Sequence, residues 1–251
     1  MKKLRKSVNI CQSYRKDKSG TFFYRPQCIL YEVQPYILFV TESWLNENVP
    51  TGCLDPNSCY HVKRCDRKTW RGGGVCIFVH RSLQPVQVDV NCTYKELELL
   101  CFDLICNTRK LHFFCAYRPP CNDSRGQVYL DLLLKCITAY TGKCCTSVIV
   151  GDFNLPNIDS FDWNTYSRIN SSVNNAMLTF VIESGFCQFV NFATHGCKLL
   201  DIVLANDPLI ISSVEAASPL GNRRHTNHQV SFRERVRVSR NLTLVFFVYD
   251  T

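Results

Sequence analysis

Six short apolar runs, each ending abruptly at polar or turn-forming residues, constrain the fold of this chain most strongly. They are YILFVTESWL (36–45), GVCIFVH (74–80), ELLCFDLI (98–105), LHFFCAYRPP (111–120), SVIVGDFN (147–154) and LLDIVLAND (199–207). Their length, their β-branched and aromatic content and their Gly, Pro or Asn boundaries predict strands rather than helices.

Two longer stretches between these runs have helical spacing. GQVYLDLLLKCITAY (126–140) places apolar residues three and four apart, and SSVNNAMLTFVIESG (171–185) opens on serines suited to an N-cap and closes on a glycine suited to the C′ position. No repeat or linker interrupts the chain, and 46% of its residues are apolar, enough for a sizeable core. Strands and helices alternate irregularly, which predicts a mixed sheet packed with helices.

Charge favours a polyanionic partner. The chain carries a formal net charge of +8, which is concentrated in two places. The first 18 residues hold seven Lys and Arg against one Asp, and SFRERVRVSR (231–240) holds four Arg against one Glu. Either cluster could follow a phosphate backbone, although a solvated arm is the simpler interpretation of the N-terminal one.

The 16 cysteines do not indicate a secreted disulfide scaffold, because the N-terminus has no apolar signal segment. Cys76, Cys101 and Cys115 lie within apolar runs, where cysteine behaves as a small buried hydrophobe. Four residues (Cys53, Cys59, His61 and Cys65) offer zinc ligands, but their spacing matches no common finger and we expect no zinc there. No apolar run reaches the roughly 18 residues of a membrane span, so we expect a nuclear or cytoplasmic protein that is not secreted.

Polar residues with chemical potential gather at the strand ends. They are Glu42, Tyr117, Asp152, Asn154 and Asp201, with His225 in a later loop. Each alone has a structural explanation, such as a turn, a cap or a salt bridge. Together they provide what metal-assisted phosphodiester hydrolysis requires: carboxylates for a hard divalent cation, a general base, and donors for the charge that builds on phosphorus.

Six segments in order, TESWL, RGGGVCIFV, CAYRPP, VIVGDFN, LLDIVL and GNRRHTNHQV, resemble the endonuclease/exonuclease/phosphatase domain, most closely that of LINE-type non-LTR retrotransposons. The resemblance covers about residues 30–235. It implies a four-layer α/β sandwich, with two mixed sheets face to face and helices outside. We therefore expect this domain over residues 31–240, after an atypical basic segment (1–30) that could replace the first strand and helix, and before a C-terminal tail (241–251).

The resemblance also assigns roles. Glu42 and Asp152 would hold Mg²⁺ or Mn²⁺, and Asp152 would activate water. Tyr117 would contact the scissile phosphate and Asn154 would orient it. Asp201 would pair with His225, which would stabilise the transition state. Hydrolysis would nick DNA and leave a 3′-hydroxyl.

Two departures from the family pattern bear on activity. The usual Ser-Asp-His loop here has Arg223 and Arg224 before the histidine, so a metal-side carboxylate is replaced by a cation. The first-strand asparagine that helps to hold the metal has no clear counterpart, and Asn9 is a weak candidate. Arg118, Arg223 and Arg224 are candidate contacts to nucleic acid.

Three functions remain open from the sequence. The first is a retrotransposon-derived DNA endonuclease domain that Arg224 impairs. The second is a nucleic-acid-binding remnant without cleavage, and the third a phosphatase of the same superfamily. For the first, DNA is the expected partner, the domain is expected to be monomeric, and a reverse transcriptase domain would belong to the same polyprotein in a full-length element.

Overall fold

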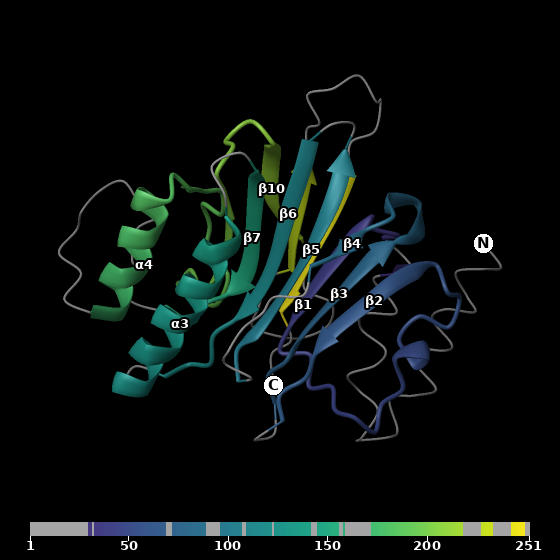
Figure 1. Cartoon of the computed structure of the whole chain (residues 1–251), viewed down its shortest axis with the longest axis horizontal. Coiled ribbons are helices and arrows are strands. Elements are labelled where there is room, and N and C mark those ends of the chain that lie inside the picture. The colour runs from purple at the N-terminus through teal and green to yellow at the C-terminus, as the bar shows by residue number, and fades with distance from the viewer. Residues whose placement is uncertain are drawn as a thin grey trace.

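A computed structural model describes residues 30–31, 33–68, 72–88, 96–106, 109–121, 123–141, 145–155, 158, 172–217, 227–232 and 242–248. Their strands form two six-stranded sheets that pack face to face (Figure 1). Sheet A has the order β10 (Ile211–Ala217), β11 (Asn227–Phe232), β12 (Leu242–Val248), β1 (Ile37–Thr41), β3 (Val75–His80), β2 (Tyr60–Cys65). Sheet B has the order β4 (Val86–Gln87), β5 (Glu98–Cys106), β6 (Arg109–Tyr117), β7 (Thr146–Asp152), β9 (Asp201–Ala205), β8 (Cys187–Gln188).

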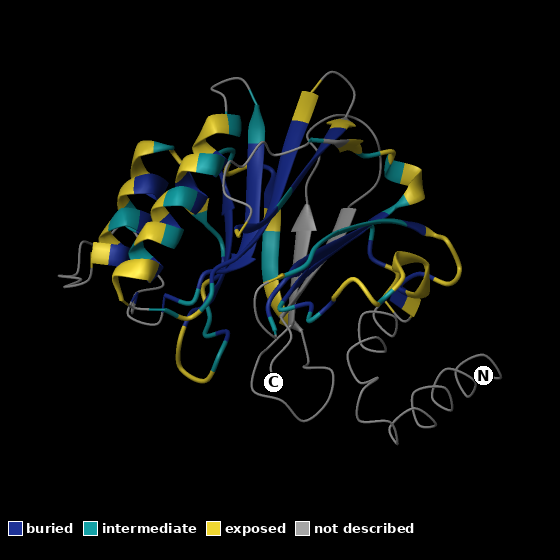
Figure 2. Ribbon diagram, turned by 60° about the horizontal axis from the view of Figure 1, so that its bottom comes forward, coloured by how far each residue is buried: buried dark blue, intermediate teal, exposed yellow. Residues whose placement is uncertain are grey.

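Two helices, α3 (Ser124–Tyr140) and α4 (Ser172–Glu183), cover the outer face of sheet B (Figure 1). α3 starts where it does because the Asp123 carboxylate accepts hydrogen bonds from the backbone N–H groups of Arg125 and Gly126. The buried side chains of α3 recur at helical spacing: Leu130, Leu133, Leu134 and Ile137. Figure 2 shows the result, with buried strands inside and helices that are buried on one side and exposed on the other.

Aromatic side chains fill the space between the sheets. Phe39 of β1 lies 6.3 Å, ring to ring, from both Phe102 of β5 and Phe113 of β6, and those two rings stack 5.1 Å apart. The outer face of sheet A has its own smaller apolar cluster, in which residues of the 45–54 segment, with the short 3₁₀ helix η2 (Thr51–Cys53), meet β1, β2 and β3. A second 3₁₀ helix, η3 (Arg81–Leu83), follows β3.

The predicted fold class, a sandwich of two sheets with helices, is confirmed. All six predicted strands and both predicted helices are present, as β1, β3, β5, β6, β7, β9, α3 and α4. Among the described residues, no helix has the length and apolar character needed to cross a membrane. The atypical segment 1–30 lies, except for Leu30, outside the described residues.

The expected C-terminal tail is wrong for residues 242–248. This segment is β12, which pairs in parallel with β1 and antiparallel with β11, in the interior of sheet A. The sequence LTLVFFV explains this position. β-branched and aromatic residues favour strands, and an apolar strand is best protected when strands pair with it on both sides. One edge of β1 thus pairs with β3, and the other is covered by a strand from the opposite end of the described chain.

Deleting residues 242–251 should destabilise the domain severely. The deletion exposes the edges of β1 and β11 and separates sheet A into two parts, with an expected loss of about 5 kcal/mol or more in the free energy of unfolding. Deleting only residues 249–251 is the matched control and should leave the unfolding transition nearly unchanged. Chemical denaturation followed by circular dichroism measures both, and equal transitions for the two truncations would contradict the interior position of β12.

Candidate active site

Three of the sequence-predicted site residues lie side by side at one end of sheet B. Tyr117 ends β6 and pairs with Asp152, which ends the parallel strand β7. Asp152 in turn faces Asp201, the first residue of the antiparallel strand β9. Paired residues on neighbouring strands point to the same face, so the phenol and the two carboxylates form one row. All three are buried.

Glu42 joins this row from sheet A. It follows β1 directly, and its Oε1 accepts a hydrogen bond from the hydroxyl of Tyr117. Its backbone has φ of 50°, a left-handed conformation that is uncommon for glutamate. The two backbone N–H groups that follow are held by the glycine loop: Ser43 donates to the Gly74 carbonyl at 3.0 Å and Trp44 to the Gly73 carbonyl at 2.8 Å.

The glycines of this loop are required by the close approach. Gly74 has φ of 85°, and a Cβ there would lie 2.6 Å from the Oγ of Ser43. Gly73 and Gly74 therefore let the loop before β3 hold the turn that carries Glu42.

The electrostatics of the row suit a divalent cation. Burial raises the pKa of Asp152 well above its usual value, and the neighbouring Asp201 and Glu42 carboxylates raise it further. Burial, with the Glu42 carboxylate beside it, also raises the pKa of Tyr117, so this phenol stays protonated and donates. Carboxylate oxygens are the donors that Mg²⁺ prefers, and a cation beside Glu42 and Asp152 would relieve their mutual repulsion.

Asn154 lies beside this row in a tightly held turn. Its backbone N–H donates to Oδ1 of Asp152 at 3.0 Å, and its side-chain amide donates to the Arg118 carbonyl at 2.9 Å. Its φ of 47° is left-handed, which asparagine tolerates better than most residues. The Asp152 backbone carbonyl accepts from the N–H of Arg118 at 2.9 Å, so the ends of β6 and β7 stay locked together.

Arg118 does not have the role predicted for it. Its side chain is fully buried rather than available to nucleic acid. Its guanidinium donates to the backbone carbonyls of Phe153 at 3.2 Å, Asn154 at 3.0 Å, and Cys121. Arginine has five donors in a rigid fork, which suits it to tie together two loops whose carbonyls would otherwise be unpaired. Arg118 is a structural support beneath the site.

Four residues with predicted or considered roles lie outside the described part of the chain: Asn9, Arg223, Arg224 and His225. The other members of the set, Glu42, Tyr117, Asp152, Asn154 and Asp201, are brought together.

The sequence matches the endonuclease/exonuclease/phosphatase family over residues 23–239. The chain belongs to this family. The match spans all the described site residues and most of both sheets. No curated protein sequence matches the chain significantly.

Solved structures of other endonuclease/exonuclease/phosphatase proteins have a similar fold. The 3′ phosphatase NExo from Neisseria, bound to product DNA hairpin, superimposes with a TM-score of 0.61 at 14% identity, covering 83% of this chain and 93% of that one. The endonuclease domain of TRAS1, a telomere-specific non-LTR retrotransposon, gives 0.61 at 13% identity, covering 88% and 95%. A mannosyl-6-phosphatase from Bacteroides thetaiotaomicron gives 0.57 at 12% identity, covering 85% and 90%. At these identities the likeness concerns the fold.

Two residues that sequence reasoning missed complete the surroundings of Tyr117 in this family member. The Arg67 guanidinium lies 5.5 Å from the centre of the Tyr117 ring. Its Nε donates to Oε1 of Glu98 at 2.6 Å, while the other Glu98 oxygen accepts from the Gly74 N–H. Glu98 is the residue opposite Tyr117 in the ladder between β5 and β6. The sequence signal for Glu98 is a glutamate at the start of an apolar run. Its position opposite Tyr117 becomes apparent only from the register of the strands.

Replacing Arg118 with alanine should destabilise the loops that carry the site residues. Three backbone carbonyls lose their charge-assisted donors, and we expect a loss of about 3 kcal/mol in the free energy of unfolding. Arg125→Ala is the matched control, because Arg125 is exposed and its ion pair is with the half-exposed Asp123; its unfolding midpoint should not move. Urea denaturation compares the two, and equal stabilities would argue against the supporting role.

Proposed function

We propose that this chain is a metal-dependent DNA endonuclease-type domain derived from a non-LTR retrotransposon, with cleavage weakened by Arg224. The observation that carries the proposal is the row of Glu42, Tyr117, Asp152 and Asp201, in which carboxylates from two sheets meet a protonated phenol. Such a row binds a cation and directs a donor at a phosphate, which is the chemistry of phosphodiester hydrolysis.

The described side chains divide the work as follows. Glu42 and Asp152 would hold Mg²⁺ or Mn²⁺, which would supply charge stabilisation to the phosphate oxygens. The Asp152 carboxylate, next to Asp201 and close to Glu42, would take the proton of the attacking water as the general base. Tyr117 would turn its hydroxyl from Glu42 to a phosphate oxygen, and the Asn154 side chain would orient that phosphate.

Two further roles involve residues beyond the described part. Asp201 would hold His225, and the imidazolium would stabilise the charge on phosphorus before the 3′-hydroxyl leaves. Arg224 stands where the family has a metal-side aspartate. Two unit charges about 4 Å apart, at an effective dielectric constant near 20, interact with roughly 4 kcal/mol before screening by salt. A change from a carboxylate to a guanidinium would therefore weaken metal binding.

DNA is the proposed substrate. The net charge of +8 favours a polyanion. Support for nucleic acid over a small phosphorylated molecule comes from the RGGG and YRPP segments, which resemble the retrotransposon branch. The domain would act as a monomer in the nucleus or cytoplasm. In a full-length element, a reverse transcriptase domain on the same polyprotein would extend the 3′-hydroxyl.

Asp152→Ala should abolish nicking. Supercoiled plasmid incubated with the purified chain and Mg²⁺ or Mn²⁺ should be nicked slowly, and the substitution should reduce the rate by about a thousandfold because general base and metal ligand are lost together. Asp131→Ala, which removes an exposed carboxylate on α3, is the control and should retain the wild-type rate. EDTA should stop the reaction. Nicking that persists in Asp152→Ala would contradict the assigned site.

Arg224→Asp should raise the nicking rate by about tenfold or more, because it restores a carboxylate beside the metal. Arg125→Asp makes the same change in charge on the exposed first turn of α3 and should not raise the rate. If neither the wild type nor Arg224→Asp nicks DNA and both bind it with steep salt dependence, the chain is a binding remnant. If both instead hydrolyse only small phosphomonoesters, it is a phosphatase.

A further inference from the structure

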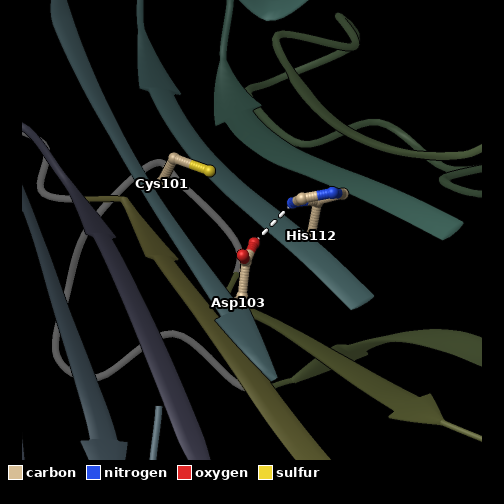
Figure 3. A group of neighbouring side chains, drawn as sticks. All are labelled: Cys101, Asp103 and His112. Atoms are coloured by element: carbon tan, nitrogen blue, oxygen red, sulfur yellow. Dashed lines mark hydrogen bonds and ion pairs between the residues drawn. The ribbon is translucent and has the colours of Figure 1, made fainter. Parts of the chain in front are cut away.

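A second group of ligand-type side chains lies on sheet B, away from the candidate active site. Cys101 and Asp103 come from β5 and His112 from β6, and Figure 3 shows their sulfur, oxygen and nitrogen atoms turned toward one another. One ligand atom from each residue lies within 4.8 Å of the others. All three residues are buried, with 7%, 1% and 6% of their surface exposed.

The strand register explains why these three meet. Asp103 and His112 are directly opposite each other in the antiparallel ladder of β5 and β6. Cys101 is two residues before Asp103 and so points to the same face of the sheet. Nδ1 of His112 is hydrogen-bonded to Oδ1 of Asp103. The grouping therefore follows from the backbone of two long paired strands, which gives it a rigid frame.

The chemistry of the three donors selects among metals. A soft thiolate, an imidazole and one carboxylate oxygen are the ligands of Zn²⁺, whereas Mg²⁺ and Ca²⁺ take oxygen donors almost exclusively. We propose that Cys101, Asp103 and His112 bind a zinc ion, with water in the fourth tetrahedral position. On binding, the Cys101 thiol releases its proton to solvent. Nδ1 of His112 and Oδ1 of Asp103 then face the metal instead of each other.

Lys110 supports this arrangement from outside. Its Nζ lies 2.6 Å from Oδ2 of Asp103, the oxygen that does not contact His112. The ammonium group thus holds the carboxylate in place and leaves Oδ1 directed at the thiol and the imidazole. Outer partners of this kind orient metal-ligating carboxylates in many zinc sites.

The zinc site is separate from the candidate active site. His112 and Tyr117 are five residues apart on β6, so their side chains lie on opposite faces of sheet B and roughly 17 Å apart along the strand. Phe113, next to His112, points between the sheets to Phe39. The zinc would therefore bridge β5 and β6 on the face of sheet B that points away from sheet A, and would take no part in phosphodiester hydrolysis.

Cobalt substitution tests the proposal on the whole chain. The protein is stripped with a chelator and titrated with Co²⁺ alone, and the readout is the near-ultraviolet thiolate-to-cobalt charge-transfer band. We expect the wild type to give this band, Cys101→Ser to lose it, and Cys76→Ser, which alters a buried cysteine in sheet A, to keep it. Asp152→Ala should keep it too. A band unchanged by Cys101→Ser overturns the proposal.

X-ray absorption at the zinc edge of the wild-type protein gives a test that needs no variant to fold. About one zinc per chain with a single sulfur at about 2.3 Å and nitrogen or oxygen ligands at about 2.0–2.2 Å is expected. Lys110→Met should lower zinc affinity by about tenfold while leaving the ligand set unchanged. No zinc retained at neutral pH, or a shell of two or more sulfurs, overturns the site.

Discussion

The aromatic contact between the two sheets is the constraint on which the candidate site depends. Phe39 on one sheet packs against Phe102 and Phe113 on the other, and this contact sets how β1 lies over β6. Glu42 is three residues beyond Phe39, and Tyr117 is four residues beyond Phe113. The two polar side chains can meet only if the sheets keep this separation and alignment. The apolar core therefore determines the geometry of the polar row, although none of its atoms takes part in chemistry.

The polar row also shows how local strain is maintained. Glu42 adopts a left-handed backbone that would be unfavourable in an isolated turn by about 1–3 kcal/mol. Backbone hydrogen bonds to Gly73 and Gly74 hold it there, and Glu98 with Arg67 holds Gly74 in turn. The backbone strain at Glu42 is thus offset by the hydrogen bonds of the neighbouring loop. The backbone that carries Glu42 is thus preorganised by hydrogen bonds within the protein.

Much of the fold and part of the site could be predicted from the sequence. Apolar runs that stop at Tyr117 or Asp152 indicate both a strand and its end, so the strand ends and the polar residues on them are predicted together. The burial of Arg118 cannot be predicted from the sequence, because an arginine followed by prolines gives no sign of burial; only the backbone carbonyls around it in the structure do. The run LTLVFFV at 242–248 has the local pattern of a strand, but its partner β1 lies far away in sequence, so nothing local indicates that the run belongs in the interior of sheet A. The register that joins Asp103 to His112 was invisible for the same reason.

The interior position of β12 has a consequence for how the protein folds. In sheet B, the consecutive strands β5, β6 and β7 pair with one another, so this part of the sheet can form early. In sheet A, β12 lies between β1 and β11, so these two strands cannot be joined into one sheet before β12 is in place. β1 and β12 lie at opposite ends of the described sequence. Long-range pairing of this kind slows folding. During synthesis, β1 would remain with one edge open while almost all of the intervening chain leaves the ribosome, and this edge is where a nascent chain would be most exposed to aggregation or to a chaperone.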